Sequence, residues 1–269
     1  ASAFIESTLA QIWKVRGKDG EFRGGPAYYI HQALGSRGLG VLFSVLLILC
    51  FAFGFNGLQA FNATSALEYY LPGEAMPKAA IASGIVLAVM TAAVIFGGTK
   101  RISVITSIVV PIMAIAYIAI ALWTTITNIT WLPQVFALVF SSAFDFQSIF
   151  GGFAGSVVML GIKRGLFSNE AGMGSTPHAH AMAKVKHPHE QGVVAMTGVF
   201  IDTFVVLTMT ALVVISTLYA GNGILSAGAA EGVSKANMAQ LAFGTVLGSR
   251  AGSMFVAVCL LFFAFSTIL

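Results

Sequence analysis

The sequence predicts an all-α, polytopic membrane protein, and three observations support this fold class. Of the 269 residues, 57% are hydrophobic and 9% are charged. Soluble globular domains carry about 25% charged residues, so this chain has too few charges to cover its surface in water. Several apolar stretches reach about 20 residues, the length that spans a bilayer as a helix. The charged residues gather in the connections between these stretches.

The apolar stretches follow one another along the whole chain. Residues 1–16 are predicted to form the cytoplasmic end of a helix that leads into a polar loop. Pro72 and Gly73 interrupt the chain after the first complete span. Pro111 lies inside the third span, where a membrane helix tolerates a kink. The predicted spans are 40–66, 79–98, 102–127, 145–162, 192–218 and 251–269.

Two longer connections lie between the later spans. Residues 131–144 combine Trp131 with three phenylalanines, which predicts an interfacial helix along the membrane surface. Residues 220–249 are rich in glycine, alanine and serine and are predicted to contain short helical pieces.

The distribution of Lys and Arg predicts which side of the membrane each connection faces. Alternating spans place eleven of the fourteen basic residues on one side and only Lys78, Lys235 and Arg250 on the other. Cytoplasmic loops carry an excess of Lys and Arg, so the first side is predicted to be the cytoplasm. We interpret the net charge of +4 as a topology signal and expect no nucleic-acid partner. The eleven residues are Lys14, Arg16, Lys18, Arg23, Arg37, Lys100, Arg101, Lys163, Arg164, Lys184 and Lys186.

The cysteines and the chain ends carry less information. Cys50 and Cys259 both lie in apolar stretches, which is typical of buried thiols and indicates neither a disulfide framework nor a metal cluster. The sequence opens at Ala1 without a signal peptide and stops at Leu269 inside an apolar stretch. We therefore expect an internal fragment of a longer protein.

The span 40–66 carries three amide side chains, Asn56, Gln59 and Asn62. Their spacing of three residues places them on one face of a helix. An amide in the apolar part of a membrane needs a hydrogen-bond partner or a wet cavity. The face therefore either lines a solute pathway or forms hydrogen bonds with another helix, and both alternatives stay open here.

Residues 151–156 and the polar segment 168–175 form a second candidate region. The run Gly151-Gly152-Phe153-Ala154-Gly155-Ser156 either lets two helices approach closely or breaks a helix and exposes its backbone groups to a ligand. In the polar segment, Ser168, Asn169 and Glu170 gate the inner mouth of a pathway, cap a short helix, or form an ordered cytoplasmic turn.

Three more polar residues lie deep in predicted spans. Asp202 is about ten residues into the span 192–218, where a carboxyl group either binds a cation or bonds to a neighbouring helix. Ser266 and Thr267 lie far into the last span. Their hydroxyls either bond back to the preceding helical turn or offer oxygen ligands to Na⁺.

The histidines suggest a metal site or an enzyme, but the pattern supports neither. His178 and His180 form only a His-x-His pair, without the His-Glu-x-x-His or paired-cysteine spacing of a metal site. Together with His187 and His189 they are interpreted as solvated loop histidines. Ser175 lies near His178, but the Gly-x-Ser-x-Gly elbow of serine hydrolases is absent. A membrane-embedded enzyme that uses Ser175 or the histidines stays as an alternative.

Five motifs together resemble the alanine or glycine:cation symporter family, and the resemblance covers essentially the whole chain. The longest, from Arg164 to Ser175, is the most specific. The five are Arg23-Gly24-Gly25-Pro26-Ala27-Tyr28-Tyr29-Ile30, Gly151-Gly152-Phe153-Ala154-Gly155, Arg164-Gly165-Leu166-Phe167-Ser168-Asn169-Glu170-Ala171-Gly172-Met173-Gly174-Ser175, Gly198-Val199-Phe200-Ile201-Asp202-Thr203 and Phe263-Ala264-Phe265-Ser266-Thr267.

The resemblance implies a fold and an activity. The fold is the five-plus-five inverted-repeat transporter fold, LeuT-like and of the APC superfamily. Residues 1–269 would be one incomplete transporter domain that runs from the end of helix 2 to helix 8 and lacks N- and C-terminal helices of the same chain. The activity is import of alanine or glycine by sodium-coupled symport with alternating access, as a multi-pass protein of the inner (plasma) membrane. A non-transporting amino-acid sensor on the same fold is a further alternative.

The resemblance also implies site residues. A discontinuous sixth helix would contact the amino acid through Gly152, Gly155, Ser156 and Val157. Other substrate contacts would come from Gln59, Asn56 and Thr267. Ser266 and Thr267 would line a sodium site. Asn169, Glu170 and Asp202 are gating or structural candidates. Na⁺ is the coupling ion, the lipid bilayer is the surrounding partner, and neither an organic cofactor nor a catalytic residue is expected.

Overall fold

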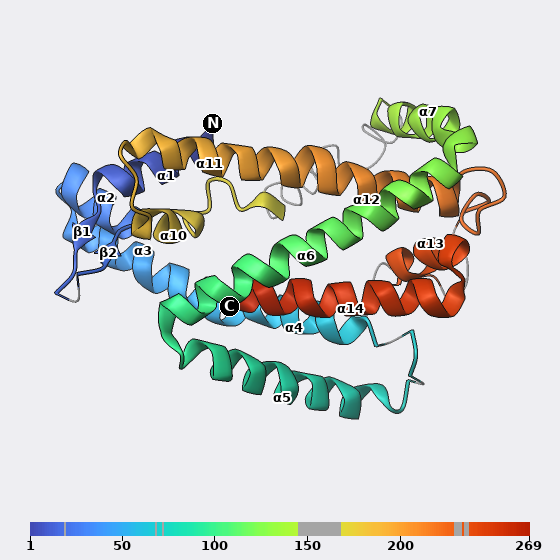
Figure 1. Ribbon diagram of the computed structural model, residues 1–269, viewed down its shortest axis with the longest axis horizontal. Helices are drawn as coiled ribbons and strands as arrows, with labels where there is room; N and C mark the ends of the chain where they lie inside the picture. Colours follow the sequence, from blue (N-terminus) through green and yellow to red (C-terminus); the bar gives the residue numbers. More distant parts are fainter. Residues whose placement is uncertain (19, 68, 72, 145–167, 229–232, 234–236) are drawn as a thin grey trace. The chain divides into compact units, whose positions relative to one another are not determined.

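The computed structural model describes all residues except 19, 68, 72, 145–167, 229–232 and 234–236 (Figure 1). The regular secondary structure of the described residues is helical apart from one short antiparallel hairpin, which pairs β1 (Val15–Arg16) with β2 (Phe22–Arg23). The sequence predicted only a polar loop here. Gly20 has a positive φ of 79°, which permits the tight turn between the two strands.

Five helices in the described part of the chain are long and apolar enough to cross a membrane. Each begins a few residues before the range expected from the apolar stretches. The start of a helix depends on its first turn, such as the proline that opens Pro188–Tyr219, and not on hydropathy alone. The expected span 145–162 lies outside the described residues. The five helices are Arg37–Ser65, Met76–Ile95, Lys100–Thr127, Pro188–Tyr219 and Ser249–Ile268.

Two of these helices contain π-helical segments, which the sequence did not predict. In the first, η1 (Cys50–Phe55) separates α3 (Arg37–Leu49) from α4 (Asn56–Ser65). π-Helical turns inside α-helices are frequent at functional sites. Asn56 directly follows η1, and Asp202 lies inside another π-helical segment, η3 (Ile201–Val206). The other helix with π-helical segments is Pro188–Tyr219. It consists of α11 (Pro188–Phe200), η3, α12 (Leu207–Val214) and η4 (Ile215–Tyr219).

The other elements complete the chain. Pro111 lies within α6 (Gly98–Thr127) without ending it. The expected interfacial segment 131–144 is helical, as α7 (Leu132–Ala143). The long connection 220–249 contains α13 (Met238–Leu247). The remaining elements are α1 (Ser2–Ile12), α2 (Pro26–Ala33), α5 (Met76–Ile95), η2 (Ile129–Trp131), α10 (Thr176–Met182) and α14 (Ser249–Ile268).

The chain divides into two compact units. The first consists of residues 1–50 and 144–208, and the second of residues 51–143 and 209–269. In the first unit α1 packs along α11 and contacts α10, while α2 packs on α3. In the second unit α14 contacts α13, α4, α6 and α5. The second unit is therefore organised around α14.

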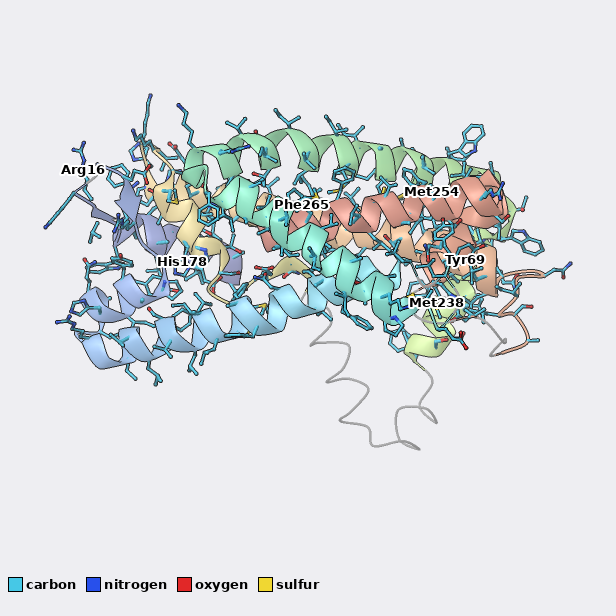
Figure 2. The ribbon with its side chains drawn as sticks, turned by 90° about the horizontal axis from the view of Figure 1, so that it is seen from below. Arg16, Tyr69, His178, Met238, Met254 and Phe265 are labelled. Atoms are coloured by element: carbon cyan, nitrogen blue, oxygen red, sulfur yellow. The ribbon has the colours of Figure 1, made fainter. Side chains whose placement is uncertain are left out.

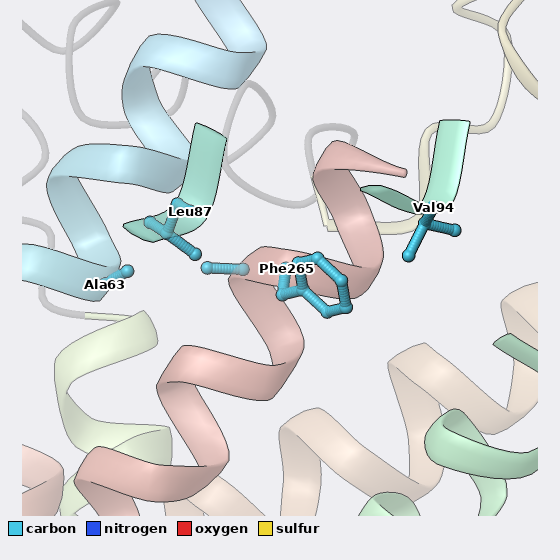
Figure 3. Packing of buried hydrophobic residues seen from close by; sticks show 5 residues of the cluster. Ala63, Leu87, Val94 and Phe265 are labelled. Atoms are coloured by element: carbon cyan, nitrogen blue, oxygen red, sulfur yellow. The ribbon is translucent and has the colours of Figure 1, made fainter. Parts of the chain in front are cut away.

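Apolar packing in the second unit joins α4, α5 and α14. Phe265 of α14 belongs to one buried cluster with Ala63 of α4 and with Leu87 and Val94 of α5 (Figure 3). Away from such clusters the spans expose apolar side chains, among them Ile81 of α5, which is 66% exposed. Exposed apolar faces of this kind suit contact with lipid, as expected of a membrane protein.

Candidate functional site

The amide side chains of α4 have no partners in the described part of the chain. Asn56 and Gln59 are half-buried and Asn62 is exposed. Among the described residues, no hydrogen bond is formed by the side chain of Asn56, Gln59 or Asn62. Within the described ranges, these amides therefore do not join helices to one another. Their donors and acceptors stay available to a solute.

Ser266 and Thr267 of α14 bond to their own helix. The Ser266 hydroxyl donates to the Phe263 carbonyl oxygen at 2.9 Å, and the Thr267 hydroxyl donates to the same oxygen at 2.8 Å. This is the back-bonding that serine and threonine commonly make inside helices. Each hydroxyl oxygen keeps its lone pairs for a second interaction, because a hydroxyl is one donor and two acceptors. The two oxygens can therefore still face a cation.

The structure brings the Gln59 segment of α4 close to the hydroxyl pair of α14. Ala63 of α4 shares a buried cluster with Ala264 and Phe265 of α14. Gln59 precedes Ala63 by about one helical turn, and Ser266 directly follows Phe265. The two helices run antiparallel, so both candidate segments extend in the same direction from this contact. The Gln59 amide and the two hydroxyls thus lie at a similar level along the α4–α14 pair, with Ser266 and Thr267 on a different side of α14 from Ala264 and Phe265.

A groove of about 470 Å³ lies beside Asn56, between α4, α5 and the end of α14. Thr91 contributes the other polar group of note, and its hydroxyl oxygen is buried without a partner among the described residues. Neither Gln59 nor Asn62 lines the groove. The rest of its lining is apolar, so it lacks the polar groups that would fix a charged solute. The remaining lining residues are Ala60, Gly84, Leu87, Ala88, Ala92, Ile95, Phe96 and Ile268.

Asp202 has a hydroxyl partner in the first unit. The Ser168 hydroxyl donates to a carboxylate oxygen of Asp202 at 2.9 Å. One residue on, the Asn169 side-chain amide donates to the Thr203 hydroxyl at 3.2 Å. The Asn169 side-chain oxygen also accepts from the Ala171 N–H at 3.0 Å. These bonds fasten the polar segment to η3, and they favour the structural reading of Asp202.

The turn that follows Asn169 is built from unusual backbone conformations. Glu170 has φ of 53°, and it is the one non-glycine residue with positive φ among those described. Gly172 and Gly174 adopt positive φ as well, at 89° and 81°. The Ser175 hydroxyl donates to the Glu170 carboxylate at 2.5 Å. No side chain caps α10, so Glu170 acts on its start only through Ser175.

Glu6 of α1 holds this turn from the other side. Its carboxylate accepts the Gly172 N–H at 3.0 Å. Burial raises the pKa of Glu6, while the N–H groups of Gly172 and Gly174 work in the opposite direction. Burial also raises the pKa of Tyr29 to about 12, with a further contribution from the charge of Glu6. These residues lie outside the five candidate spans.

The interpretation of His178 and His180 as solvated loop residues is wrong. Both lie in α10 and are half-buried (Figure 2). The His178 ring packs so closely on Gly25 that a Cβ atom there would lie 2.7 Å from it. Nδ1 of His180 lies 2.6 Å from the Gln191 side-chain oxygen. The docking of α10 on α1 and β2 removes these rings from water, and that docking has no local signal.

His187 and His189 are exposed, as expected, but His189 lies in the first turn of α11 and not in a loop. Their rings stack with centroids 5.8 Å apart. Across the residues that the structure describes, no group of three His, Cys, Asp or Glu side chains is arranged to hold a metal ion.

Sequence reasoning missed a polar network between α1 and α10. The Gln11 amide donates to the carbonyl oxygens of His180 and Ala183, and the Lys14 ammonium donates to Ala183 as well, at 2.9 Å. Lys14 also donates to the Gln11 side-chain oxygen at 2.6 Å. Burial lowers the pKa of Lys14. A cation and an amide at the C-terminus of a helix satisfy its unpaired carbonyls. The one signal in the sequence is a glutamine near the end of α1, three residues before Lys14.

Four predicted substrate contacts, Gly152, Gly155, Ser156 and Val157, lie outside the described residues, as do Lys163 and Arg164. The described candidates belong to two sets. Asn56, Gln59, Ser266 and Thr267 are in the second unit, and Asn169, Glu170 and Asp202 are in the first.

Comparison with known proteins assigns this chain to a family. The family profile described as "Sodium:alanine symporter family" matches residues 1–269. The chain is 44% identical over 271 residues to "Amino-acid carrier protein AlsT" of Bacillus subtilis, which covers 100% of this chain and 54% of that protein.

Two further relatives of similar identity are named for different amino acids. "Probable sodium/glutamine symporter GlnT" of Bacillus subtilis is 39% identical over 269 residues, covering 100% of this chain and 53% of that protein. "Sodium/alanine symporter AgcS" of Methanococcus maripaludis is 38% identical over 274 residues, covering 100% of this chain and 58% of that protein. The chain spans about half the length of the curated relatives it matches.

Proposed function

We infer the function from one premise: the chain belongs to the sodium:alanine symporter family. Its apolar helices make it a multi-pass membrane protein. We propose that the protein is a secondary transporter of the inner (plasma) membrane that imports a small neutral amino acid, alanine or glycine, together with Na⁺. The names of AlsT and AgcS support an amino-acid and alanine substrate, whereas GlnT, a relative of similar identity, is named for glutamine.

The observation that carries the proposal is the pairing of α4 with α14. Gln59 offers an unpaired amide, and Ser266 and Thr267 offer two hydroxyl oxygens about one turn from the same helix contact. An amide suits the charged ends of a zwitterion, and hard cations such as Na⁺ prefer oxygen ligands. In this proposal Gln59, with Asn56 and Thr267, contacts the amino acid, and Ser266 with Thr267 binds Na⁺.

The proposed mechanism is alternating access on the LeuT-like five-plus-five fold. Gly152, Gly155, Ser156 and Val157 would complete the amino-acid site from a discontinuous sixth helix. Because the two ligands share neighbouring groups on α4 and α14, binding of Na⁺ raises the affinity for the amino acid. By linkage the amino acid raises the affinity for Na⁺ by the same factor. The Na⁺ gradient then drives import against the gradient of the amino acid.

Asn169, Glu170 and Asp202 have a supporting role in this proposal. Asn169 bonds to Thr203, Glu170 to Ser175 and Asp202 to Ser168. These bonds hold the polar turn against η3 and α10. A turn fixed by side-chain bonds at several points suits an inner gate that opens as one piece.

The structure gives a physical argument against a serine enzyme. The Ser175 hydroxyl donates to Glu170, while Nδ1 of His178 lies 3.1 Å from the Ser175 carbonyl oxygen and not beside the hydroxyl. A nucleophilic serine needs its hydroxyl within hydrogen-bond reach of the base. Replacing His178 and His180 with alanine should therefore leave most amino-acid uptake intact, whereas an enzyme that uses them would lose its activity.

The test of the proposed function is uptake by the full-length protein in proteoliposomes. Labelled alanine and labelled glycine are supplied under an inward Na⁺ gradient, with choline replacing Na⁺ in the control. Concentrative uptake that disappears in choline is the expected result. Equal uptake in both media would exclude sodium coupling, and alanine binding without uptake would identify a sensor.

Single substitutions then test the residue roles. Gln59→Leu should raise the half-saturating amino-acid concentration, and Ser266→Ala and Thr267→Ala should raise the half-saturating Na⁺ concentration. Each loss of one bond is expected to cost about three- to tenfold. Thr106→Ala is the matched control, because Thr106 also bonds back to its own helix, at 2.9 Å to Ile102, but lies outside the candidate site. An equal rise in the half-saturating Na⁺ concentration in Thr106→Ala would contradict the assignment of Ser266 and Thr267 to the Na⁺ site.

A further inference from the structure

Gln240 of α13 is a fully buried polar side chain, with 0% of its surface exposed. Its side-chain amide donates to the carbonyl oxygen of Ala66 at 2.9 Å, across 174 residues of sequence. Ala66 directly follows the last residue of α4. Carbonyls at the C-terminus of a helix have no partner within the helix, so Gln240 supplies the bond that α4 itself cannot make.

Only one end of the Gln240 side-chain amide is paired. The side-chain oxygen of Gln240 is buried without a hydrogen-bond partner in the described part of the chain. An unpaired buried acceptor destabilises the fold. An apolar side chain of the same length would remove this acceptor, but it would also remove the donor to the Ala66 carbonyl oxygen. Gln240 therefore donates to the Ala66 carbonyl oxygen even though its own side-chain oxygen is left unpaired.

The packing around Gln240 makes α13 a rigid support. Phe243, one turn along α13, is fully buried and packs against Tyr117 of α6 and Phe255 of α14, with ring centroids 5.6 Å and 5.9 Å apart. A Cβ atom on Gly252 would lie 2.5 Å from the Phe243 backbone, so α14 approaches α13 at backbone distance. The amide of Gln240 is therefore held in a fixed place relative to α14.

A second bond reinforces the same end of the second unit. The Tyr70 hydroxyl, just beyond α4, donates to the Ser253 hydroxyl near the start of α14 at 2.8 Å. Tyr69 and Met254 line one small pocket there, and Figure 2 shows them at the same end as Met238 of α13, with Phe265 farther along the unit. Lys78 and Arg250 mark this end as the predicted non-cytoplasmic side.

We propose that Gln240 is a positioning residue that fixes the outer end of α4 on the α13–α14 pair and so keeps Gln59 in register with Ser266 and Thr267. The inference rests on the proposed function, because it assigns those three residues to one site for amino acid and Na⁺. Without the bond, only the Tyr70–Ser253 bond and apolar packing hold the outer end of α4 on α14. This end of α4 then shifts along α14, and the amide and the hydroxyls no longer meet one solute pair at the same time.

The first test compares transport by the full-length protein with and without the bond. Gln240→Met keeps the length of the side chain and removes the donor. We expect the half-saturating concentrations of both alanine and Na⁺ to rise about three- to tenfold, with maximal uptake per folded transporter within about twofold of the wild type. Unchanged half-saturating concentrations with lower maximal uptake would reduce Gln240 to a structural residue and overturn the proposal.

Gln134→Met is the matched control. Like Gln240, Gln134 is a glutamine whose side chain bonds to a distant backbone group: its side-chain oxygen accepts the Gly221 N–H at 3.1 Å. Unlike Gln240, it is exposed. This variant should leave both half-saturating concentrations unchanged. If Gln240→Met does not reach the membrane, Tyr70→Phe removes the neighbouring bond from a less buried position and should shift the same two concentrations in the same direction.

A second measurement does not depend on transport. Spin labels at Phe61→Cys in α4 and Val258→Cys in α14, both exposed positions, report the separation of the two helices after Cys50 and Cys259 are replaced with alanine. Gln240→Met should broaden the distance distribution, and Gln134→Met should not. An unchanged distribution overturns the positioning role even where uptake is normal. Absence of sodium-coupled uptake in the wild type would refute the proposed function alone.

Discussion

Asp202 and Gln59 are both polar side chains in long apolar helices, yet the structure gives them different surroundings. The carboxylate of Asp202 accepts a hydrogen bond from Ser168, and Asn169 bonds to its neighbour Thr203. The Gln59 amide has no such partner among the described residues. A polar group that is already bonded stabilises the fold, whereas one that is not is available to a ligand.

Substitution of Asp202 separates a structural role from cation binding. Asp202→Asn keeps an oxygen that accepts from Ser168 and removes the charge, so uptake should stay within about twofold of the wild type. Asp202→Ala and Ser168→Ala both remove the bond and should lower the free energy of unfolding by about 1 kcal/mol. Folded Asp202→Asn protein without any uptake would show instead that the charge itself is needed, as for a cation site.

Glu6 predicts a pH dependence of stability. Its pKa in the folded protein is raised above the ordinary value of 4.5, so the folded state binds the proton more tightly than the unfolded state. The contribution of Glu6 to stability is therefore fully present below pH 4.5 and is lost as the pH rises through the raised pKa.

The substitution Glu6→Gln tests this pH dependence, because glutamine keeps an acceptor for the Gly172 N–H and cannot ionise. In thermal unfolding in detergent, the variant should be more stable than the wild type at pH 7, and this difference should disappear toward pH 4.5. A difference that grows as the pH falls would contradict the assignment of the shift to burial.

At the scale of elements, close helix contacts depend on glycine at particular positions. In α11, a Cβ atom on Gly192 would lie 2.7 Å from the Phe4 ring of α1 and would also press on the Thr8 hydroxyl. Gly198, six residues along the same helix, has nothing within 4 Å. The two glycines look alike in the sequence, and only Gly192 sets the distance between two helices.

The pair Gly192→Ala and Gly198→Ala tests this difference. Alanine at position 198 should leave stability unchanged or raise it by up to about 1 kcal/mol, because alanine favours the helix. Alanine at position 192 should lower the free energy of unfolding by about 1–3 kcal/mol, since α1 must move away from α11. Both values come from thermal or denaturant unfolding of the purified variants, and equal effects would contradict the packing of α1 on α11.

At the scale of the whole molecule, the basic residues predict the orientation in the membrane. Lys78 is predicted to face the outside and Lys186 the cytoplasm. Both are described residues: Lys78 lies in the first turn of the span Met76–Ile95, and Lys186 lies between two spans. A membrane-impermeant thiol reagent added to intact cells should label Lys78→Cys and not Lys186→Cys, in a background without Cys50 and Cys259. Labelling of both becomes the expected result once the membrane is permeabilised. The reverse pattern in intact cells would invert the topology.

Parts of the candidate site could be predicted from sequence and parts could not. Three amides spaced by three residues identified the polar face of α4, and adjacent hydroxyls identified the end of α14, because both are local patterns. The contact of Ala63 with Ala264 and Phe265, which brings the two segments together, joins residues about two hundred positions apart and has no local signal. The family resemblance, more than periodicity, suggested that Gln59 and Ser266 belong to one site.

The sequence by itself determined that this is an all-helical membrane protein and predicted which loops face the cytoplasm. Hydropathy and charge act through the bilayer, segment by segment, so they need no knowledge of packing. Only the tertiary structure decided that α10 buries His178 and His180, that Asp202 bonds to Ser168, and that Gln240 holds the end of α4. Those outcomes depend on which distant groups come within hydrogen-bond distance, and packing alone fixes that geometry.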